Sequence, residues 1–361
     1  MKLDHIGIEG FKSIKKADID LTSLNVLIGA NGAGKTNFIS LFKLLNKMLE
    51  GNFQTNIKAG GGAESFLYFG SKTTPEIKIS LLFKDNGYQV IFVPSASDQL
   101  IFKQEECSFH DKTRYTNPKV EILDKGHLET VFFTQGHHTG IAYYVKNTLL
   151  SWKYYHFHDT SESAKVKKTG AINDNFYLRT DAANLAAFLF VLKSKYLTHY
   201  EAIRDHIRLV APFFDDFILR PTAVNEDNIR LEWKEKGSDF PFLAHHLSDG
   251  TLRFICLATV LLQPNLPSTI IIDEPELGLH PYAIKVLASL MKATSKKTQL
   301  IVSTQSVPLV NEFEAEDLIV VDKKDGASTF SRPESEKLKD WLTEYSLGEL
   351  WEKNVLGGRP Q

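Results

Sequence analysis

The sequence predicts an α/β fold with a parallel core, a β-rich lobe and a helical lobe. Three observations carry this prediction. A glycine-rich loop at 29–36 follows a short apolar strand and precedes a helical stretch. Alternating β segments fill most of 76–158, and helical patterns follow from about residue 181. Two more apolar runs, at 269–272 and 300–303, have the length of buried parallel strands.

Composition limits the class of protein. The chain has 361 residues, of which 43% are hydrophobic and 24% charged, and its formal net charge is −2. These values are typical of globular proteins and exclude a surface that is basic throughout. Two distant cysteines, Cys107 and Cys256, indicate neither a disulfide framework nor a metal cluster. Because no membrane-length apolar run and no signal-peptide pattern is present, we expect a cytoplasmic protein without a membrane partner.

The first motif is the loop 29–36, GANGAGKT, of the form G-x-x-x-x-G-K-[ST]. Glycines let main-chain N–H groups surround a phosphate, and the following helix N-terminus adds a positive dipole end. Lys35 is expected to reach the β- and γ-phosphates, and the Thr36 hydroxyl to bind Mg²⁺. The apolar strand 24–28 and the helix from Lys35 to about Glu50 give the motif its required context.

A second set of residues completes an ATP site. The run 269–276, TIIIDEPE, is an apolar strand that ends in two carboxylates. Asp273 suits Mg²⁺, and Glu274 suits the orientation or deprotonation of an attacking water. Gln305 ends another buried strand, where a polar side chain can sense the γ-phosphate.

A second anion-binding helix start lies in 247–253, LSDGTLR. Ser248 offers a hydroxyl and Gly250 an uncovered N–H group, both at the N-terminus of a helix predicted over 247–262. One chain needs only one such device for its own γ-phosphate. We therefore expect this one to serve the nucleotide of a second copy.

The remaining elements follow from local patterns. Strands are predicted at 3–8, 17–21, 77–83, 88–93, 100–102, 120–123, 131–133, 141–145, 152–157, 217–219, 229–233 and 318–321. Helices are predicted from an N-cap at Asp181 toward Val210, over 281–292 and over 334–351. The glycines at 60–62 are expected in a flexible loop.

In this order, the motifs resemble those of ABC/SMC/RecF-like P-loop ATPases. More narrowly, they are similar to stand-alone bacterial AAA-type ATPases related to OLD-family proteins. The resemblance spans nearly the whole chain and implies an ABC-type ATPase head. The stretch from His158 to Ser248 is too short for a long coiled coil. The matching segments are GFKSI at 10–14, GANGAGKTN at 29–37, DAANL at 181–185, LSDGTLR at 247–253, IIIDEPELGLHP at 270–281, STQS at 303–306 and LGELW at 347–351.

The resemblance implies roles for individual residues, with ATP and Mg²⁺ as the ligands. The Walker A contacts to ATP are implied for Gly29, Asn31, Gly32, Ala33, Gly34, Lys35, Thr36 and Asn37. Thr36 and Asp273 take the magnesium positions, and Glu274 and Gln305 the catalytic positions.

Four more residues take positions that complete the nucleotide site in the family. Ser248 and Gly250 resemble the signature residues that bind the partner's ATP, and 277–281 takes the D-loop position at the dimer interface. Lys12 and Ser13 match a loop that approaches the α-phosphate in SMC-type relatives; a surface turn is the alternative.

Three positions depart from the common family pattern. Gln305 stands where His is common. A glutamine can form a hydrogen bond with a phosphate but cannot carry a proton, so slow hydrolysis is one of the alternatives. Asp249 stands where transporters usually have Gly, which favours the SMC/RecF-like branch. The glutamine of the usual Q-loop is not placed, and the candidates are Gln135 or the pair His158 and Asp159.

These motifs predict an organisation in four segments. An N-terminal ATPase lobe is expected over 1–160 and a helical insert over 161–246. The signature, Walker B, D-loop and switch segments are expected over 247–332, and a C-terminal helical tail over 333–361.

The favoured function is an ATP-driven switch. Two heads would sandwich two ATP molecules as a homodimer or within a higher oligomer, and hydrolysis would reopen the pair. By resemblance, a separate effector such as a TOPRIM-type nuclease is expected, with a role in anti-phage defence. The alternatives are a RecF-like repair ATPase that binds DNA directly, a structural clamp with very slow hydrolysis, and a transporter subunit.

Overall fold

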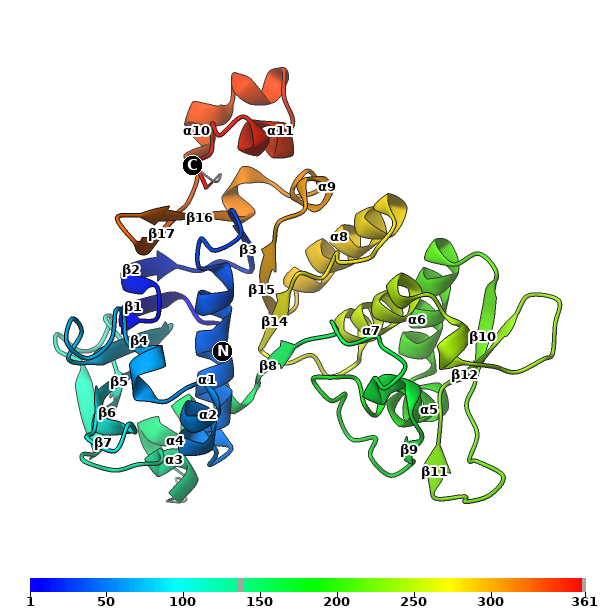
Figure 1. Ribbon diagram of the computed structural model, residues 1–361, viewed down its shortest axis with the longest axis horizontal. Helices are drawn as coiled ribbons and strands as arrows, with labels where there is room; N and C mark the ends of the chain where they lie inside the picture. The colour runs from blue at the N-terminus through cyan, green and yellow to red at the C-terminus, as the bar shows by residue number, and fades with distance from the viewer. Residues whose placement is uncertain (135–138, 359–361) are drawn as a thin grey trace. The chain divides into compact units, whose positions relative to one another are not determined.

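The computed structural model describes residues 1–134 and 139–358, which form two compact units (Figure 1). Unit 1 comprises Met1–Tyr154, Pro267–Ile271 and Thr298–Gln361. Unit 2 comprises Tyr155–Leu266 and Ile272–Lys297. Gln135, one of the two Q-loop candidates, lies outside the described residues.

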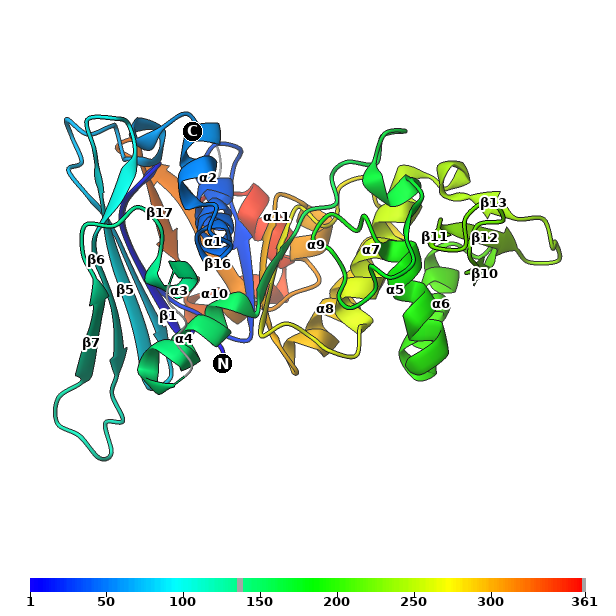
Figure 2. The same ribbon diagram turned by 90° about the horizontal axis from the view of Figure 1, so that it is seen from below.

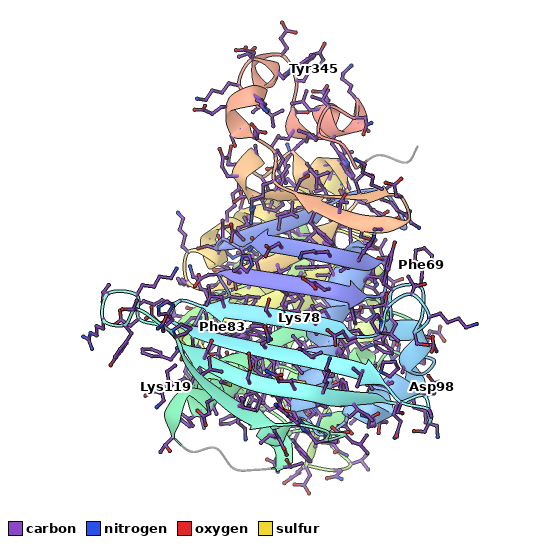
Figure 3. The ribbon with its side chains drawn as sticks, turned by 90° about the vertical axis from the view of Figure 1, so that its left-hand side faces the viewer. Phe69, Lys78, Phe83, Asp98, Lys119 and Tyr345 are labelled. Atoms are coloured by element: carbon purple, nitrogen blue, oxygen red, sulfur yellow. The ribbon has the colours of Figure 1, made fainter. Side chains whose placement is uncertain are left out.

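Unit 1 contains an antiparallel sheet of six strands in the order β2-β1-β4-β5-β6-β7. Alternate residues of β4 are buried, as expected for a sheet with one face on the core. Lys78 lies on the other face, which Figure 3 shows. The strands are β1 (His5–Phe11), β2 (Ile14–Asp20), β4 (Ile77–Phe83), β5 (Asn86–Pro94), β6 (Leu100–Phe109) and β7 (Lys119–Asp124).

A second six-stranded sheet has the order β17-β16-β3-β15-β14-β8. Its centre is built on β3, which pairs in parallel with both β15 and β16. Every residue of β3 and β15 is buried, which explains their continuous apolar runs. The strands are β3 (Leu24–Ile28), β8 (Trp152–Tyr155), β14 (Thr269–Asp273), β15 (Gln299–Thr304), β16 (Leu318–Lys324) and β17 (Ala327–Ser331).

Helix α1 (Lys35–Leu49) lies between these two sheets (Figure 2). It buries residues at helical spacing, among them Phe38, Leu41 and Leu45, in one core with side chains of both sheets. This packing fixes the start of α1, where the glycine-rich loop ends. The other helices of unit 1 are α2 (Phe53–Ala59), α3 (Val131–Thr134), α4 (Gly140–Leu150), α9 (Val307–Val310), α10 (Ser335–Leu338) and α11 (Leu347–Glu352).

Unit 2 is mainly helical. Helix α7 (Asp249–Leu262) is buried from Leu252 to Leu261 and packs between α6 (Leu197–Val210) and α8 (Pro281–Ser295). Its other elements are α5 (Leu185–Lys195), β9 (Gly170–Ala171), β10 (Phe214–Ile218), β11 (Asn228–Ile229), β12 (Glu232–Glu235) and β13 (Phe242–Leu243).

Two strand predictions are wrong. The segments 131–133 and 141–145 belong to helices α3 and α4. In α4 the buried residues Ala142, Val145 and Leu149 recur at helical spacing, and a short apolar run does not distinguish a strand from a buried helix.

The predicted helix cap at Asp181 is also wrong. Ala182 has a φ of 55°, which a helix does not accommodate, and α5 begins only after Asn184. The Asp181 carboxylate instead accepts hydrogen bonds from Lys165 Nζ at 3.0 Å and from the Ala183 N–H group at 3.2 Å.

Other differences concern the extent of elements. The predicted tail helix over 334–351 is divided into α10, a 3₁₀ turn at Trp341–Thr343 and α11. The segment predicted as one strand at 229–233 contains the end of β11 and the start of β12. Neither α2 nor β17 was predicted. In the described part of the chain, no helix is both long enough and apolar enough to cross a membrane.

Candidate functional site

The glycine-rich loop joins β3 to α1 and is packed so closely that only glycine fits at two positions. A Cβ on Gly29 would lie 2.2 Å from the carbonyl oxygen of Val321, and one on Gly34 would lie 2.0 Å from Ser328 Oγ. Gly34 caps α1 with a φ of 118° and without a side-chain hydrogen bond. The first N–H groups of α1 thus have no side-chain cap, which leaves them available to a phosphate.

Lys35 lies across this loop. Its side chain is buried, and Nζ donates to the carbonyl oxygens of Gly29 at 2.6 Å and of Ala30 at 3.1 Å. Thr36, the predicted magnesium ligand in this unit, is exposed at the second position of α1. The residues therefore fit a Mg-ATP ligand: a cradle of main-chain groups, a buried cation and an accessible hydroxyl.

A chain of polar groups connects the loop to neighbouring elements. Asn37 Nδ2 donates to Ser13 Oγ at 2.7 Å, and Ser13 Oγ lies 2.7 Å from Ser328 Oγ. Ser328 Oγ also donates to the Ala33 carbonyl at 2.6 Å. Because each hydroxyl has one hydrogen and can both donate and accept, these groups form one continuous chain from α1 to the loop. Ser328 was not singled out in the sequence, since no motif marks its strand.

Lys12 lies in the turn between β1 and β2, with a φ of 48°. Its Nζ donates to Ser40 Oγ on α1 at 3.0 Å and lies 5.2 Å from the centre of the Phe66 ring. Burial, and then the nearby Lys43, lower the pKa of Lys12. Lys12, Ser13 and Asn37 line one open pocket of about 570 Å³, so the structure brings these three predicted residues together.

The exposed side chain of Phe69 belongs to the same pocket. Its loop is hydrogen-bonded to the Lys12 turn, since the Lys12 N–H group donates to the Phe66 carbonyl at 2.8 Å, and Phe69 has a φ of 53°. Figure 3 shows Phe69 at one edge of the antiparallel sheet. Sequence reasoning missed this residue, because a single exposed aromatic in a loop carries no pattern.

The switch residue Gln305 directly follows β15 and is exposed. In the parallel pairing of β15 with β3, Thr304 lies opposite Ile28. The next residues along the two strands are Gln305 and Gly29, so the switch residue begins at the same sheet edge as the phosphate loop. Ser306 then caps α9 by accepting from the Leu309 N–H group at 3.3 Å.

In unit 2, Asp273 ends β14 and is 8% exposed. Glu274 follows with a φ of 44°, a conformation that is uncommon outside glycine and is frequent at functional sites. The Nε2 atom of His158 lies 2.9 Å from the carbonyl oxygen of Asp273. The His158 side chain therefore holds the main chain beside Asp273 and Glu274. The Asp159 carboxylate instead accepts hydrogen bonds from the hydroxyl and N–H group of Ser161.

The signature segment begins with Ser248 as the N-cap of α7. Ser248 is exposed, and its Oγ accepts from the Thr251 N–H group at 3.2 Å. Gly250 has a structural role that the sequence did not suggest. A Cβ at this position would lie 2.3 Å from the carbonyl oxygen of Gly278, so the D-loop can approach the first turn of α7 only because residue 250 is a glycine.

Arg253 was also missed, although a cation within an apolar helix is a usable signal. It is 5% exposed, and its Nε donates to the Phe157 carbonyl at 2.9 Å. The guanidinium also donates to the carbonyls of Leu277 and, at 3.3 Å, of His158. One side chain thus joins the signature helix, the D-loop and the 157–158 segment.

The predicted site residues therefore fall into two groups. Unit 1 contains the ATP loop, Lys12, Ser13 and Gln305, and unit 2 contains the signature residues, Asp273 and Glu274. Among the described residues, no cluster of three or more His, Cys, Asp or Glu side chains has metal-binding geometry.

A protein-family model matches this arrangement over residues 24–311, from β3 to the end of α9. The model is AAA_21, described as "AAA domain, putative AbiEii toxin, Type IV TA system". The chain belongs to the AAA_21 family. The match includes the phosphate loop, the signature helix, β14 and β15. As a P-loop ATPase of this type, the AAA_21 chain is expected to bind ATP.

Three curated proteins are similar to this AAA_21 chain. An ATP/GTP phosphatase of Helicobacter pylori is 22% identical over 308 residues, which cover 79% of either chain. The OLD nuclease of Thermus scotoductus is 23% identical over 357 residues, which cover 90% of this chain and 63% of the nuclease. The DNA repair protein RecN of Aquifex aeolicus is 35% identical over 89 residues, 25% of this chain and 17% of RecN.

Solved structures confirm the fold of the AAA_21 chain. An SMC head bound to the C-terminal winged-helix domain of ScpA matches with a TM-score of 0.59 and 15% identity, covering 94% of this chain and 100% of that one. The Smc head of Pyrococcus furiosus bound to the C-terminal domain of ScpA gives 0.56 and 16%, covering 95% and 98%. The predicted ABC-type head is therefore correct. The described residues contain no long coiled coil, since α1 and α8 reach only 15 residues each.

Proposed function

We propose that the chain binds Mg-ATP, pairs with a second copy around the nucleotide and hydrolyses it to separate again. The glycine-built loop 29–36, closed on the buried Lys35, carries this proposal. Lys35 now rests on two carbonyl oxygens of its own loop. A triphosphate offers this ammonium group stronger, charged acceptors, so nucleotide binding would draw Lys35 from the carbonyls to the phosphates.

We assign hydrolysis to Glu274, with Gln305 beside the nucleotide. A general base must be held in position before it can act on a water molecule. The unusual φ of Glu274 and the contact of His158 with the Asp273 carbonyl support such a fixed position. Gln305 would bond the γ-phosphate or the water without taking a proton.

Thr36 and Asp273 would hold Mg²⁺. Their oxygen atoms are the kind of ligand that Mg²⁺ prefers. The ion would neutralise charge that develops on the phosphates. Lys35 and the N–H groups at the start of α1 would bind and orient the same phosphates from the protein side.

The homodimer rests on the second exposed helix start. Ser248 and the first turn of α7 offer N–H groups and a hydroxyl in a 14-residue helix, as the loop does at α1. Two such helix starts in one chain suit a site in which each nucleotide is bound by both copies. Binding energy would then close the dimer, and loss of the γ-phosphate would reopen it.

Glu274→Gln tests the assignment. This variant is expected to bind ATP normally, to hydrolyse it at least about 10²-fold more slowly, and to accumulate as an ATP-dependent dimer. Phosphate release and the molar mass from light scattering measure both effects. Lys35→Ala is the matched control and should lose nucleotide binding and dimer together. Hydrolysis at the wild-type rate in Glu274→Gln would falsify the role of this carboxylate.

The trans site needs its own variant. Ser248→Arg places a bulky cation at an exposed position of unit 2, so it should prevent ATP-driven pairing and leave nucleotide binding by the loop unchanged. Light scattering and a nucleotide titration separate the two. A normal ATP-dependent dimer in Ser248→Arg would show that α7 does not face the partner's nucleotide.

We further propose that the switch acts on a separate effector, such as a TOPRIM-type nuclease, in anti-phage defence. The similarity of the chain to an OLD nuclease, which extends over 90% of the chain, supports a nuclease as the class of effector. Purification with and without ATP, followed by mass spectrometry, is expected to recover a nuclease with the Glu274→Gln dimer. Recovery of DNA without a nuclease would instead favour a repair ATPase, the alternative that the similarity to RecN supports.

A further inference from the structure

The last described segment of the chain returns from α11 to the phosphate loop within unit 1 (Figure 1). The carbonyl oxygen of Gly358 accepts a hydrogen bond from the Ala30 N–H group at 2.7 Å. A Cβ on Gly358 would lie 2.9 Å from Val320 Cγ1 and 3.4 Å from the Cα atom of Gly29. Gly358 is buried, with a φ of 76°. It therefore fills a space between β16 and the loop that admits only a glycine.

This contact acts on the same peptide group as Lys35. The N–H group of Ala30 and the carbonyl of Gly29 belong to one planar trans peptide, so they point in opposite directions. Gly358 holds the N–H side at 2.7 Å, and Lys35 Nζ holds the carbonyl side at 2.6 Å. The orientation of this peptide, and with it the resting position of Lys35, depends on the C-terminal segment.

The same tail contacts the segment behind the switch residue. The N–H group of Gly348 in α11 donates to Asn311 Oδ1 at 2.6 Å. A Cβ on Gly348 would lie 2.6 Å from both Asn311 Oδ1 and Val307 Cγ1, so α11 packs closely on α9. Only Ser306 separates α9 from Gln305. The tail thus contacts both segments of unit 1 that are expected to meet the γ-phosphate.

We propose that residues 347–358, here called the C-terminal clasp, position the phosphate loop and the Gln305 segment for nucleotide binding. The inference rests on the proposed function, because it concerns the same ATP site. The hydrogen bonds of the clasp reach Ala30 and Asn311, neither of which is a proposed catalytic residue, so its residues are positioning residues. They act by ordering the Gly29–Ala30 peptide before the nucleotide arrives, which removes an ordering cost from binding.

Deletion of 357–361 tests the clasp, since it removes the Gly358 carbonyl. Affinity for a fluorescent ADP analogue is expected to fall about three- to tenfold, the effect of one lost hydrogen bond. Deletion of Gln361 alone is the control, because it keeps the Gly358 carbonyl within a peptide bond, and it should leave the Kd unchanged. ADP is chosen so that dimerisation and hydrolysis do not contribute to the measurement.

A second pair of variants covers the case in which the shorter chain does not fold. Gly357 and Gly358 have similar φ values, 81° and 76°, but a Cβ at 357 would lie 3.9 Å from Val320 Cγ1, in ordinary contact. Gly358→Ala should therefore weaken ADP binding more than Gly357→Ala does.

The outcomes are distinct when melting temperatures are measured alongside the Kd. A purely structural tail would lower the melting temperature and leave the Kd unchanged, which would overturn the clasp. Tighter ADP binding after the deletion would also overturn it, because the tail would then restrain the loop. If the unaltered chain fails to bind ADP, the proposed function fails first and the clasp with it.

Discussion

Arg253 is buried in unit 2, and its charged guanidinium donates hydrogen bonds to main-chain carbonyl oxygens. Burial lowers the pKa of its guanidinium, although the group stays charged because the ordinary pKa of arginine is so high. Three carbonyls accept from it, those of Phe157, His158 and Leu277. A planar fork with five N–H donors on three nitrogen atoms can reach three separated acceptors at fixed angles, whereas the three donors of a lysine all lie on one nitrogen atom.

We expect Arg253→Lys to leave ADP binding unchanged and to slow ATP hydrolysis about tenfold or more. A tenfold change corresponds to about 1.4 kcal/mol, which is about the contribution of one hydrogen bond to a charged group. The physical reason is that the D-loop and the 157–158 segment would no longer be joined to the signature helix. Steady-state phosphate release measures the effect, with Lys285→Ala, an exposed cation on α8, as the control. Equal rates in both variants would contradict a coupling role.

At this scale, the sequence revealed the residues that belong to contiguous motifs. Lys35, Thr36 and Ser248 follow from local spacing alone, and their surroundings agree with those patterns. Ser328 and Phe69 do not follow from local spacing, because their importance arises from contacts across long stretches of chain. The roles assigned to the motif residues stay predictions until the variants are measured.

At the scale of elements, a buried carboxylate explains why residues 131–134 form a helix. Glu105 on β6 is fully buried and accepts from the Val131 N–H group at 3.1 Å, at the start of α3. Tyr88, Thr130 and His127 also contact its carboxylate. A carboxylate at a helix start binds free N–H groups and matches the helix dipole.

Glu105→Ala should therefore lower the free energy of unfolding by about 2 to 4 kcal/mol, since it leaves several buried donors without an acceptor. Urea unfolding followed by circular dichroism measures this. Its neighbour Glu106 is partly exposed, and Glu106→Ala should cost less than about 1 kcal/mol. A similar loss in the free energy of unfolding in both variants would mean that the buried hydrogen bonds of Glu105 do not stabilise the fold.

The strand predictions fail where tertiary contacts decide the structure. The segments 131–133 and 141–145 contain β-branched and aromatic residues, which favour strands in isolation. Glu105 and the core against α1 select helices instead. The boundaries of 24–28 and 77–83 agree with β3 and β4, because continuous burial and strict alternation are strong local signals.

At the scale of the whole molecule, both units bury one thiol. Burial raises the pKa of Cys256 to about 12 from an ordinary value of 9.0, and burial raises that of Cys107 as well, with Glu105 contributing next. A group whose pKa is higher in the folded state stabilises the fold most below its unfolded pKa. This contribution is lost as the pH rises, because the unfolded chain releases its thiol protons first.

The free energy of unfolding is therefore expected to fall between about pH 8 and pH 10, by about 1 kcal/mol for each thiol. Urea midpoints across this range measure it. A double variant, Cys107→Ala with Cys256→Ala, is less stable at neutral pH but should lose less of its stability on alkalinisation. The same pH slope in both proteins would assign the loss to other groups, such as Tyr155, whose pKa burial raises to about 12.

The contacts of Arg253 have a consequence for how such chains diverge. All three of its acceptors are main-chain oxygens, and every amino acid supplies one. Phe157, His158 and Leu277 can therefore be replaced during evolution without losing the connection, whereas the arginine cannot. Coupling through main-chain oxygens therefore constrains the identity of one residue only, the arginine. Distant relatives can share this coupling although few of the neighbouring residues are identical.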